Sequence, residues 1–303
     1  MNQMIEMDYV VPTELTEMRL DQVLAELMPE YSRSRLQQWI KQGGVKVNDK
    51  DCKPRDKVRF NDLIEVRAEL EVLEEWTPEP ITLDIVYEDD EILILNKPSG
   101  LVVHPAAGNY SGTLVNALLH YCKSLEHVPR AGIVHRLDKE TTGLMVVAKT
   151  LTAHAHLVDQ LQTRSMGREY EAVVVGTFTG GGKVDEPMAR HPVHRKKMAV
   201  ARSGKPAVTH YRIIKNFKGH AHLRLKLETG RTHQIRVHLK AINYPIVSDK
   251  LYASNRETAL GFTRLALHSH SISFLHPATG KRMTVEAPYP KDFQAALEDF
   301  VKD

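Results

Sequence analysis

The sequence predicts an α+β protein in which a mixed, largely antiparallel sheet is joined to a small N-terminal α/β module. From residue 83 onward, short apolar segments with strand-type alternation dominate, and helical segments do not alternate regularly with them as they would around a parallel sheet. Before residue 67, two short helical segments precede two short strands. The predicted divisions are an N-terminal extension at 1–18, a module at 19–66, an acidic linker at 67–82 and a larger domain at 83–303.

The charge is distributed unevenly, although the formal net charge of the 303 residues is only +3. Residues 19–60 carry ten bases and six acids, a net charge of +4. Residues 61–91 carry twelve acids and one base, net −11, and residues 92–303 carry thirty bases and sixteen acids, net +14. Two cationic blocks separated by an acidic stretch indicate a polyanionic partner and a jointed chain.

The composition excludes several classes of protein. An apolar fraction of 42% is too high for a disordered chain. Two cysteines, Cys52 and Cys122, make neither a disulfide framework nor a four-thiolate zinc site, which fits a reducing compartment. The first twelve residues lack the features of a signal peptide, and the longest uncharged stretch, 99–122, is interrupted by Gly, Pro, Asn and His. We expect a cytoplasmic protein with no membrane association, and a monomer, since nothing demands an oligomer.

The N-terminal module begins with two short amphipathic helices. Apolar side chains recur at helical spacing from Leu20 to Leu27 and again from Leu36 to Ile40, and Gly43 follows as a helix terminator. Strands are expected at 45–47 and 63–66. Basic side chains crowd these elements and form either a solvated surface or a binding face for a polyanion; they include Arg33, Arg35 and Lys41.

The larger domain is predicted to hold most of the strands. The predicted strands are residues 83–87, 92–95, 144–148, 170–175, 208–214 and 223–227, followed by a hairpin of 266–275 with 282–287. The predicted helices are residues 152–162, 232–242 and 291–301. In the second of these helices, Ile235 and Leu239 share one face, and Arg236 and Lys240 share another.

The segment HRLDKETTG at residues 135–143 is the densest group of chemically capable side chains. Arg136 and Lys139 flank Asp138, and cations near a carboxylate favour its ionised form. An ionised Asp in a loop can serve as a nucleophile, a base or a metal ligand. It can equally be a loop residue that caps a turn.

Two further segments carry candidate residues. At residues 227–238 a strand ends at Gly230 and a helix begins, so that Arg231 lies at the mouth of a natural anion site, although a surface helix with a basic first turn has the same pattern. Tyr170 begins an apolar strand and, taken alone, reads as a packed aromatic residue. A strand-to-turn junction with one cation lies at residues 96–100.

Three pairs of histidines, at 154/156, 220/222 and 268/270, are candidate transition-metal ligands. The first pair lies in a predicted helix, where a spacing of two directs the rings apart, and no carboxylate is close in sequence to the other pairs. No metal site is therefore predicted. The glycine-rich phosphate loop and the G-x-S-x-G motif are both missing from the sequence.

Taken together, residues 96–105, 135–143, 168–170 and 227–238 resemble, in order and spacing, the motifs of the RluA family of pseudouridine synthases, over roughly residues 80–290. Residues 19–66 resemble an S4 RNA-binding module. Further stretches, including 129–134 and 204–211, most resemble the branch that acts on large-subunit rRNA. The resemblance implies the pseudouridine synthase fold, no cofactor, and a partner that is the large-subunit rRNA or its precursor, with uridines of the helix 69 hairpin loop of 23S rRNA as targets.

The resemblance also implies a role for each matching residue. Asp138 corresponds to the catalytic Asp that frees uracil from C1′ of the ribose before the base rejoins through C5. Arg136 corresponds to a residue that fills the stack where the target base leaves, and Tyr170 to one that stacks on the uracil. Arg231 corresponds to the cation that pairs with the catalytic carboxylate, and Ile235 to an apolar wall of the pocket. Arg33, Arg35 and Lys41 would contact RNA from the S4-like module.

The sequence is compatible with three functions from different classes. The first is site-specific isomerisation of uridine, which the Asp138 segment favours. The second is a non-enzymatic RNA-binding or ribosome-assembly protein that uses the basic blocks and binds RNA with a steep salt dependence. The third is a metal-dependent hydrolase that uses the histidine pairs.

Overall fold

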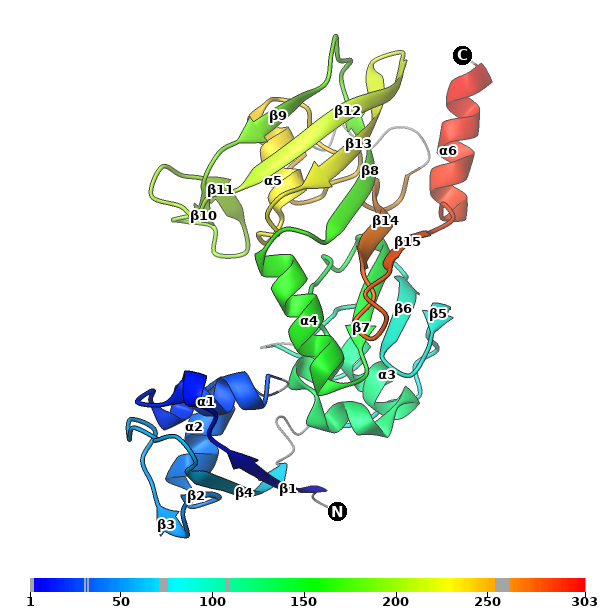
Figure 1. The fold of residues 1–303 in the computed structure, drawn as a ribbon. Coiled ribbons are helices and arrows are strands. Elements are labelled where there is room, and N and C mark those ends of the chain that lie inside the picture. The colour runs from blue at the N-terminus through cyan, green and yellow to red at the C-terminus, as the bar shows by residue number, and fades with distance from the viewer. Residues whose placement is uncertain are drawn as a thin grey trace.

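The computed structural model describes residues 3–29, 31, 33–70, 76–106, 109–253 and 262–302 (Figure 1). It contains a four-stranded sheet at the N-terminus, a nine-stranded sheet in the larger domain and a separate two-stranded ribbon. The prediction of an α+β protein with a mixed, largely antiparallel sheet is confirmed. Within the described parts of the chain, no helix is both long and apolar enough to cross a membrane.

The N-terminal sheet has the strand order β1-β4-β2-β3. Its strands are β1 (Gln3–Val10), β2 (Val45–Val47), β3 (Lys50–Asp51) and β4 (Leu63–Leu70), and its helices are α1 (Leu20–Leu27) and α2 (Arg33–Lys41). Strand β1, which the sequence analysis treated as an extension, pairs with β4 along its full length. β4 also continues to Leu70, four residues beyond the predicted strand. Residues 71–75 of the predicted linker lie outside the described residues.

A buried carboxylate joins the two helices of this module. Asp21 of α1 has no exposed side-chain surface and accepts hydrogen bonds from Arg19, from Arg33 at 2.8 Å and from Gln37 at 2.6 Å. Burial alone would raise the pKa of Asp21, but these hydrogen bonds outweigh it and the pKa is lowered. The hydrogen bonds from Arg33 and Gln37 of α2 to Asp21 of α1 therefore join the two helices.

The large sheet has the strand order β5-β6-β7-β14-β8-β13-β12-β9, and β15 pairs with β14. Among the described strand pairs of this sheet, β7 and β14 run parallel and the others antiparallel. The strands of this domain are β5 (Ile85–Glu88), β6 (Ile92–Lys97), β7 (Thr142–Ala148), β8 (Gly167–Val175), β9 (Gly182–Asp185), β10 (Met188–Arg190), β11 (Met198–Val200), β12 (Val208–Phe217), β13 (His220–Leu227), β14 (Leu267–Leu275) and β15 (Arg282–Glu286). Its α-helices are α3 (Leu114–Tyr121), α4 (Leu151–Gln162), α5 (Gln234–Ala241) and α6 (Lys291–Lys302), and short 3-10 turns lie at Lys123–His127 and Pro129–Gly132.

Helix α3 is the main helix that the sequence analysis did not predict. Its residues from Leu114 to Leu119 are all buried, so no polar face marks a helical period. Its start is fixed by a capping box, in which the Thr113 and Asn116 side chains each accept from the other's backbone N–H. The signal for this helix was therefore its cap rather than its periodicity.

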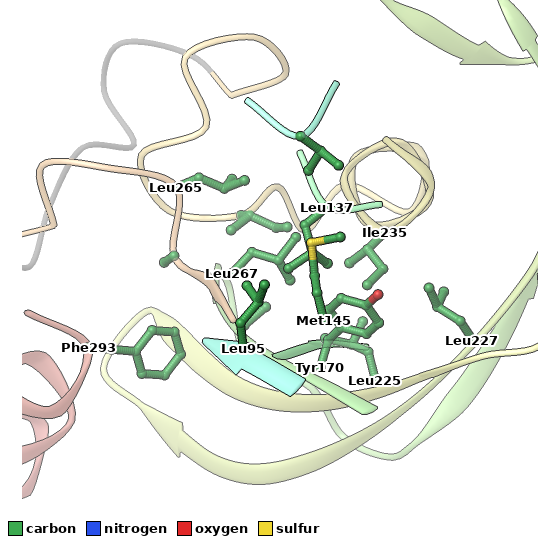
Figure 2. Packing of buried hydrophobic residues seen from close by; sticks show 14 of the residues in the cluster. Leu95, Leu137, Met145, Tyr170, Leu225, Leu227, Ile235, Leu265, Leu267 and Phe293 are labelled. Atoms are coloured by element: carbon green, nitrogen blue, oxygen red, sulfur yellow. The ribbon is translucent and has the colours of Figure 1, made fainter. Parts of the chain in front are cut away.

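Both faces of the sheet are covered, because alternate residues of β6 and β7 enter two different cores. Leu95 and Met145 pack on the face that also holds Tyr170 and Ile235 (Figure 2), and Leu93 belongs to the same cluster. The residues between them, such as Ile94 and Val146, pack on the other face against Ala153 and Leu157 of α4. A strand buried on both faces has no polar alternation, which explains the continuous apolar runs at 92–95 and 144–148.

Several histidines are buried in uncharged form, which predicts acid sensitivity. His135 accepts a hydrogen bond from the Val146 backbone N–H at 3.1 Å, and burial, then Arg168, lowers its pKa to about 3. Burial, together with His270 and Arg264, lowers the pKa of His268 to about 4. In an unfolded chain both groups would titrate near ~6.5.

We expect the free energy of unfolding to fall as the pH drops from about 6.5 toward about 4, because the unfolded chain then binds protons that the folded chain does not. Each fully protected imidazole contributes at most ~1.4 kcal/mol per pH unit, so His135 and His268 together give a slope of about 2–3 kcal/mol per unit. Urea unfolding at pH 7, 6 and 5 measures this slope. His135→Gln should reduce it and the exposed His194→Gln should not; equal stability at pH 7 and 5 would contradict the prediction.

Candidate active site

A cleft of about 780 Å³ brings together the segments that the sequence analysis singled out. Asp138 and Arg136 come from the loop before β7, Tyr170 comes from β8, and Arg231 and Ile235 come from the turn and helix after β13. Trp76, His104 and Arg130 also line it. These segments, which are far apart in the sequence, come together because β7, β14 and β8 are neighbours in the sheet and β8 pairs with β13.

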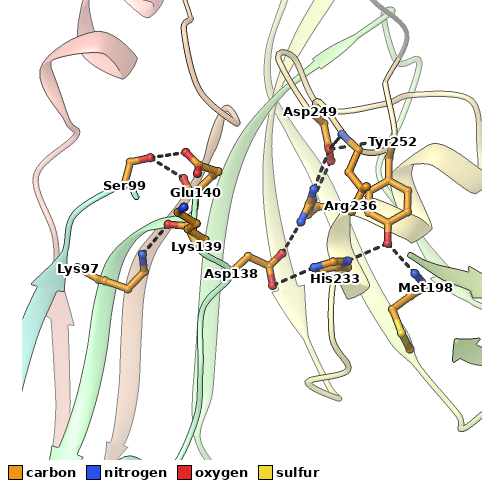
Figure 3. Close-up of polar contacts among 11 residues, drawn as sticks. Lys97, Ser99, Asp138, Lys139, Glu140, Met198, His233, Arg236, Asp249 and Tyr252 are labelled. Carbon is orange, nitrogen blue, oxygen red and sulfur yellow. Dashed lines mark hydrogen bonds and ion pairs between the residues drawn. The ribbon is translucent and has the colours of Figure 1, made fainter. Parts of the chain in front are cut away.

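The Asp138 carboxylate is bound by a buried guanidinium (Figure 3). Arg236 Nη1 donates to Asp138 Oδ2 at 3.0 Å, while its Nε and Nη2 donate to the two oxygens of Asp249 at 2.8 Å each. Burial alone would lower the pKa of Arg236, but Asp249 and Asp138 outweigh it and the pKa is raised. The cation is thus fixed by one carboxylate and presented to the other, so that Asp138 has a charged hydrogen-bond donor.

The structure corrects the role that the resemblance gave to Arg231. The Arg231 side chain is largely exposed, and its Nε donates to the Pro206 carbonyl at 3.1 Å rather than to Asp138. Arg231 lies in the turn before α5, whereas Arg236 lies in the helix, with only 11% of its side chain exposed, where it reaches Asp138. The sequence does indicate that Arg236 is shielded from solvent, because the residues before and after it in the helix, Ile235 and Val237, are both apolar.

A histidine and a tyrosine that the sequence analysis gave no role complete this network. His233 Nδ1 lies 2.8 Å from the Tyr252 hydroxyl, which also accepts from the Met198 backbone N–H at 2.8 Å (Figure 3). If the Tyr252 hydroxyl donates to Nδ1, Nε2 carries the ring proton and faces Asp138 Oδ1, 3.9 Å away. Burial lowers the pKa of His233. Its backbone is left-handed, with φ 57°, a strained conformation of the kind found at functional sites.

Tyr170 and Ile235 form an apolar wall of the cleft. Their residues are only 5% and 4% exposed, and they pack in one cluster with Leu137 (Figure 2). Burial raises the pKa of the Tyr170 phenol, so the hydroxyl keeps its proton at neutral pH. Arg136 is exposed at the cleft and, among the residues that the structure describes, has no hydrogen-bond or ion-pair partner.

A buried lysine holds the loop that carries Asp138 in place. Lys97 is fully buried, and its Nζ donates to the carbonyls of Pro98, Leu101 and Lys139 at 2.8–2.9 Å. Burial lowers the pKa of Lys97 to about 8, against the opposing effect of Glu140 and Asp138. The Gly100 N–H also donates to the Lys139 carbonyl. Lys139, the residue next to Asp138, is therefore held both by this N–H and by Lys97 (Figure 3).

Lys97→Met is expected to lower the free energy of unfolding by about 2–4 kcal/mol, because the Pro98 and Leu101 carbonyls lose the buried ammonium as donor and the Lys139 carbonyl is left with the Gly100 N–H. Activity should fall even at temperatures where the variant is folded, since the Asp138 loop is released. Urea unfolding and a turnover assay at low temperature measure the two effects. Lys183→Met, at a side chain that is 59% exposed, is the matched control and should change stability by less than ~0.5 kcal/mol.

The residues predicted to bind RNA from the N-terminal module lie on α2. Arg33 is engaged with Asp21, so part of its hydrogen-bonding capacity is used within the module. Lys41 is exposed and lines a second pocket with Arg19, Lys53 and Arg55. Arg35 is half-buried. Their contact with RNA stays a prediction.

The histidine pairs take structural positions, and no group of three or more His, Cys, Asp or Glu that could hold a metal ion occurs in the described ranges. Although no carboxylate is close to the two later pairs in sequence, Glu171 of β8 lies 2.7 Å from His222 Nε2 and 3.9 Å from His270 Nε2 in space. Its oxygens also accept from Arg224 and Tyr289. Strand pairing, which brings β13 and β14 to either side of β8, created this proximity.

Comparisons with known proteins agree with this site. The family model of RNA pseudouridylate synthases matches residues 91–241, and the S4 domain model matches residues 18–64. The ribosomal large subunit pseudouridine synthase D of Pseudomonas aeruginosa is 53% identical over 97% of this chain and 95% of its own length. The enzyme of the same name from Escherichia coli K12 is 50% identical over 98% and 95%.

Two solved human structures share the fold of the larger domain. Human RNA pseudouridylate synthase domain containing 4 aligns with a TM-score of 0.57 at 27% identity, over 72% of this chain and 93% of that one. Human RNA pseudouridylate synthase domain containing 1 aligns with a TM-score of 0.58 at 22% identity, over 75% and 96%. With half of its residues shared with full-length synthases and with Asp138 presented to a cleft beside Tyr170, this chain belongs to the RluA family of pseudouridine synthases, isomerases of RNA, and carries an N-terminal S4 domain.

Proposed function

We propose that this synthase converts specific uridines of the large-subunit rRNA, or of its precursor, into pseudouridines, with the helix 69 hairpin loop of 23S rRNA as the target. The assignment of the substrate rests on sequence identity. About half of the residues are identical, over nearly the full length, to those of synthases whose names specify the large ribosomal subunit. The charge distribution supports a polyanionic partner. We propose that the enzyme acts as a monomer in the cytoplasm.

The reaction needs a carboxylate that stays ionised beside the ribose of the target. The N1–C1′ glycosidic bond breaks, the uracil turns, and a C5–C1′ bond forms, after which the C5 proton leaves and N1 regains one. Atoms and charge balance within the nucleotide, so no oxidant and no group donor is consumed. Asp138, held by Arg236, would add to the base, attack C1′ or abstract the 2′ proton, and the His233 ring lies 3.9 Å from its second carboxylate oxygen.

The other residues of the cleft would bind and orient the base. The Tyr170 ring and Ile235 provide an apolar surface against which a uracil can stack. A uridine inside a folded RNA must be flipped out of its stack to reach them, which costs a few kcal/mol. The exposed guanidinium of Arg136 is free to occupy the vacated place and stabilise the open RNA.

The test is tritium release from 5-tritiated uridine in a transcript of the 23S rRNA segment, incubated with the purified protein. We expect one tritium released for each pseudouridine formed, with positions identified by pseudouridine mapping of rRNA from cells with and without the gene. RNA binding without any tritium release after exhaustive incubation would favour the non-enzymatic alternative. Release at positions outside the large-subunit rRNA would contradict the proposed substrate.

A further inference from the structure

One part of the cleft rim is not used by the catalytic residues. It consists of Trp76, His104 and Arg130, all of which line the same cleft as Asp138. The rings of Trp76 and His104 lie 6.2 Å apart between centroids. Trp76 comes from the segment between the S4 domain and β5, His104 from the loop after β6, and Arg130 from the turn before the Asp138 loop.

Arg130 is presented by a strained backbone. Arg130 and Ala131 both have left-handed φ values, 54° and 51°, and Gly132 follows with φ 77°. A Cβ on Gly132 would lie 2.0 Å from the Ala148 carbonyl oxygen, so the turn packs directly against β7 and only glycine fits there. Two consecutive non-glycine residues in this conformation are held by their surroundings, and such strain concentrates at ligand-binding sites.

The rim is cationic, and the described residues that line the cleft offer it no unengaged carboxylate. Arg130 and Arg136 are exposed and, in the part of the chain that the structure describes, form no ion pair or hydrogen bond. The two acids of the cleft are already engaged, Asp138 by Arg236 and Glu228 by Arg164 and His210. His104 stays uncharged, because burial, then Arg136 and Arg130, lowers its pKa to about 4.

An exposed cation beside an indole and a neutral imidazole has the chemistry of a nucleotide site. Aromatic rings stack on bases irrespective of sequence, and a guanidinium binds the phosphodiester. Clefts that hold one drug-sized ligand span about 300–1,000 Å³. A single uracil is smaller than such a ligand, so a cleft of about 780 Å³ has room for the extruded base and for part of a neighbouring nucleotide.

We propose that Trp76, His104 and Arg130 form a subsite for the nucleotide that neighbours the flipped uridine. Trp76 stacks on its base, Arg130 binds its phosphodiester, and His104 hydrogen-bonds to its sugar or base. This inference rests on the proposed function only in taking RNA as the ligand. It gives the segment between the two domains a direct part in substrate binding.

Fluorescence provides the first test, because the chain has only two tryptophans and the other, Trp39, is 4% exposed in the S4 domain core. The probe is a synthetic hairpin RNA with the helix 69 loop sequence, added to the Asp138→Asn variant so that no turnover occurs. We expect quenching of the Trp76 emission, retained when Trp39→Phe is added and lost when Trp76→Phe is added. Emission that does not change on saturation with RNA would overturn the stacking role of Trp76.

Steady-state kinetics provide the second test. Trp76→Ala and Arg130→Gln should each raise KM for the hairpin about 5- to 100-fold, with the loss concentrated in KM rather than in kcat. Arg130→Gln should also reduce the slope of log KM against log salt by about 1, since one phosphate contact is lost. Arg282→Gln, an exposed arginine of β15 outside the cleft, is the matched control.

The two proposals fail in different ways. Unchanged KM values in both variants, with normal turnover by the unaltered enzyme, overturn the subsite and leave the proposed function standing. Quenching of Trp76 by a hairpin that the unaltered enzyme never isomerises contradicts the proposed target and supports the subsite. Trp76→Phe should restore most of the affinity that Trp76→Ala loses, which separates stacking from a merely structural effect.

Discussion

Asp138→Asn is expected to abolish isomerisation, with a fall of at least ~10⁴-fold in the single-turnover rate, while RNA affinity stays within a few-fold of the unaltered enzyme. The substitution keeps the shape of the side chain and removes its charge. Arg236 and Asp249 remain paired, so the fold around the site should be retained. Tritium release with enzyme in excess over transcript measures the rate, and filter binding measures the affinity.

The control for this variant is Asp185→Asn at the end of β9, where the side chain is 57% exposed and forms a surface ion pair with Lys183. It should leave both measurements unchanged. Turnover by Asp138→Asn within tenfold of the unaltered enzyme would exclude Asp138 as the reacting carboxylate. A loss of affinity equal to the loss of rate would show that Asp138 binds RNA rather than acting on it.

Arg236→Lys is expected to lower kcat by about 10²- to 10³-fold, whereas Arg231→Lys should change it by less than about fivefold. A lysine cannot reproduce the planar fork that donates to Asp249 twice and to Asp138 once. Asp249 is fully buried at its side chain, so weakening its pair should also lower the free energy of unfolding by ~3 kcal/mol. Turnover at saturating RNA and urea unfolding measure the two effects.

The comparison of these two arginines decides between two assignments for the cation beside Asp138. A larger loss in Arg231→Lys than in Arg236→Lys would restore the assignment that the sequence motif suggested. Arg236→Gln offers a second variant, because it removes the charge but retains one donor. It should be less active than Arg236→Lys, since it leaves two carboxylates without a cation.

The sequence by itself determined the features that depend on neighbours along the chain. Continuous apolar runs at 92–95 and 144–148 predicted buried strands, and helix α4 begins and ends within one residue of its predicted range, 152–162. The position of Asp138 in a loop before β7, between cations, also followed from local order. The motif resemblance identified the family, and the comparisons confirm it.

Only the tertiary structure decided which side chains meet. The hydrogen bond from Arg236 to Asp138 spans 98 residues, and a motif with two arginines five residues apart does not reveal which of them points into the cleft. Strand β1 depends on β4, about sixty residues away, and the environment of Glu171 depends on the pairing of β8 with β13 and β14. Local propensity fixes the elements, but the positions of side chains at a site are set by sheet register and helix rotation, which are properties of the packed chain.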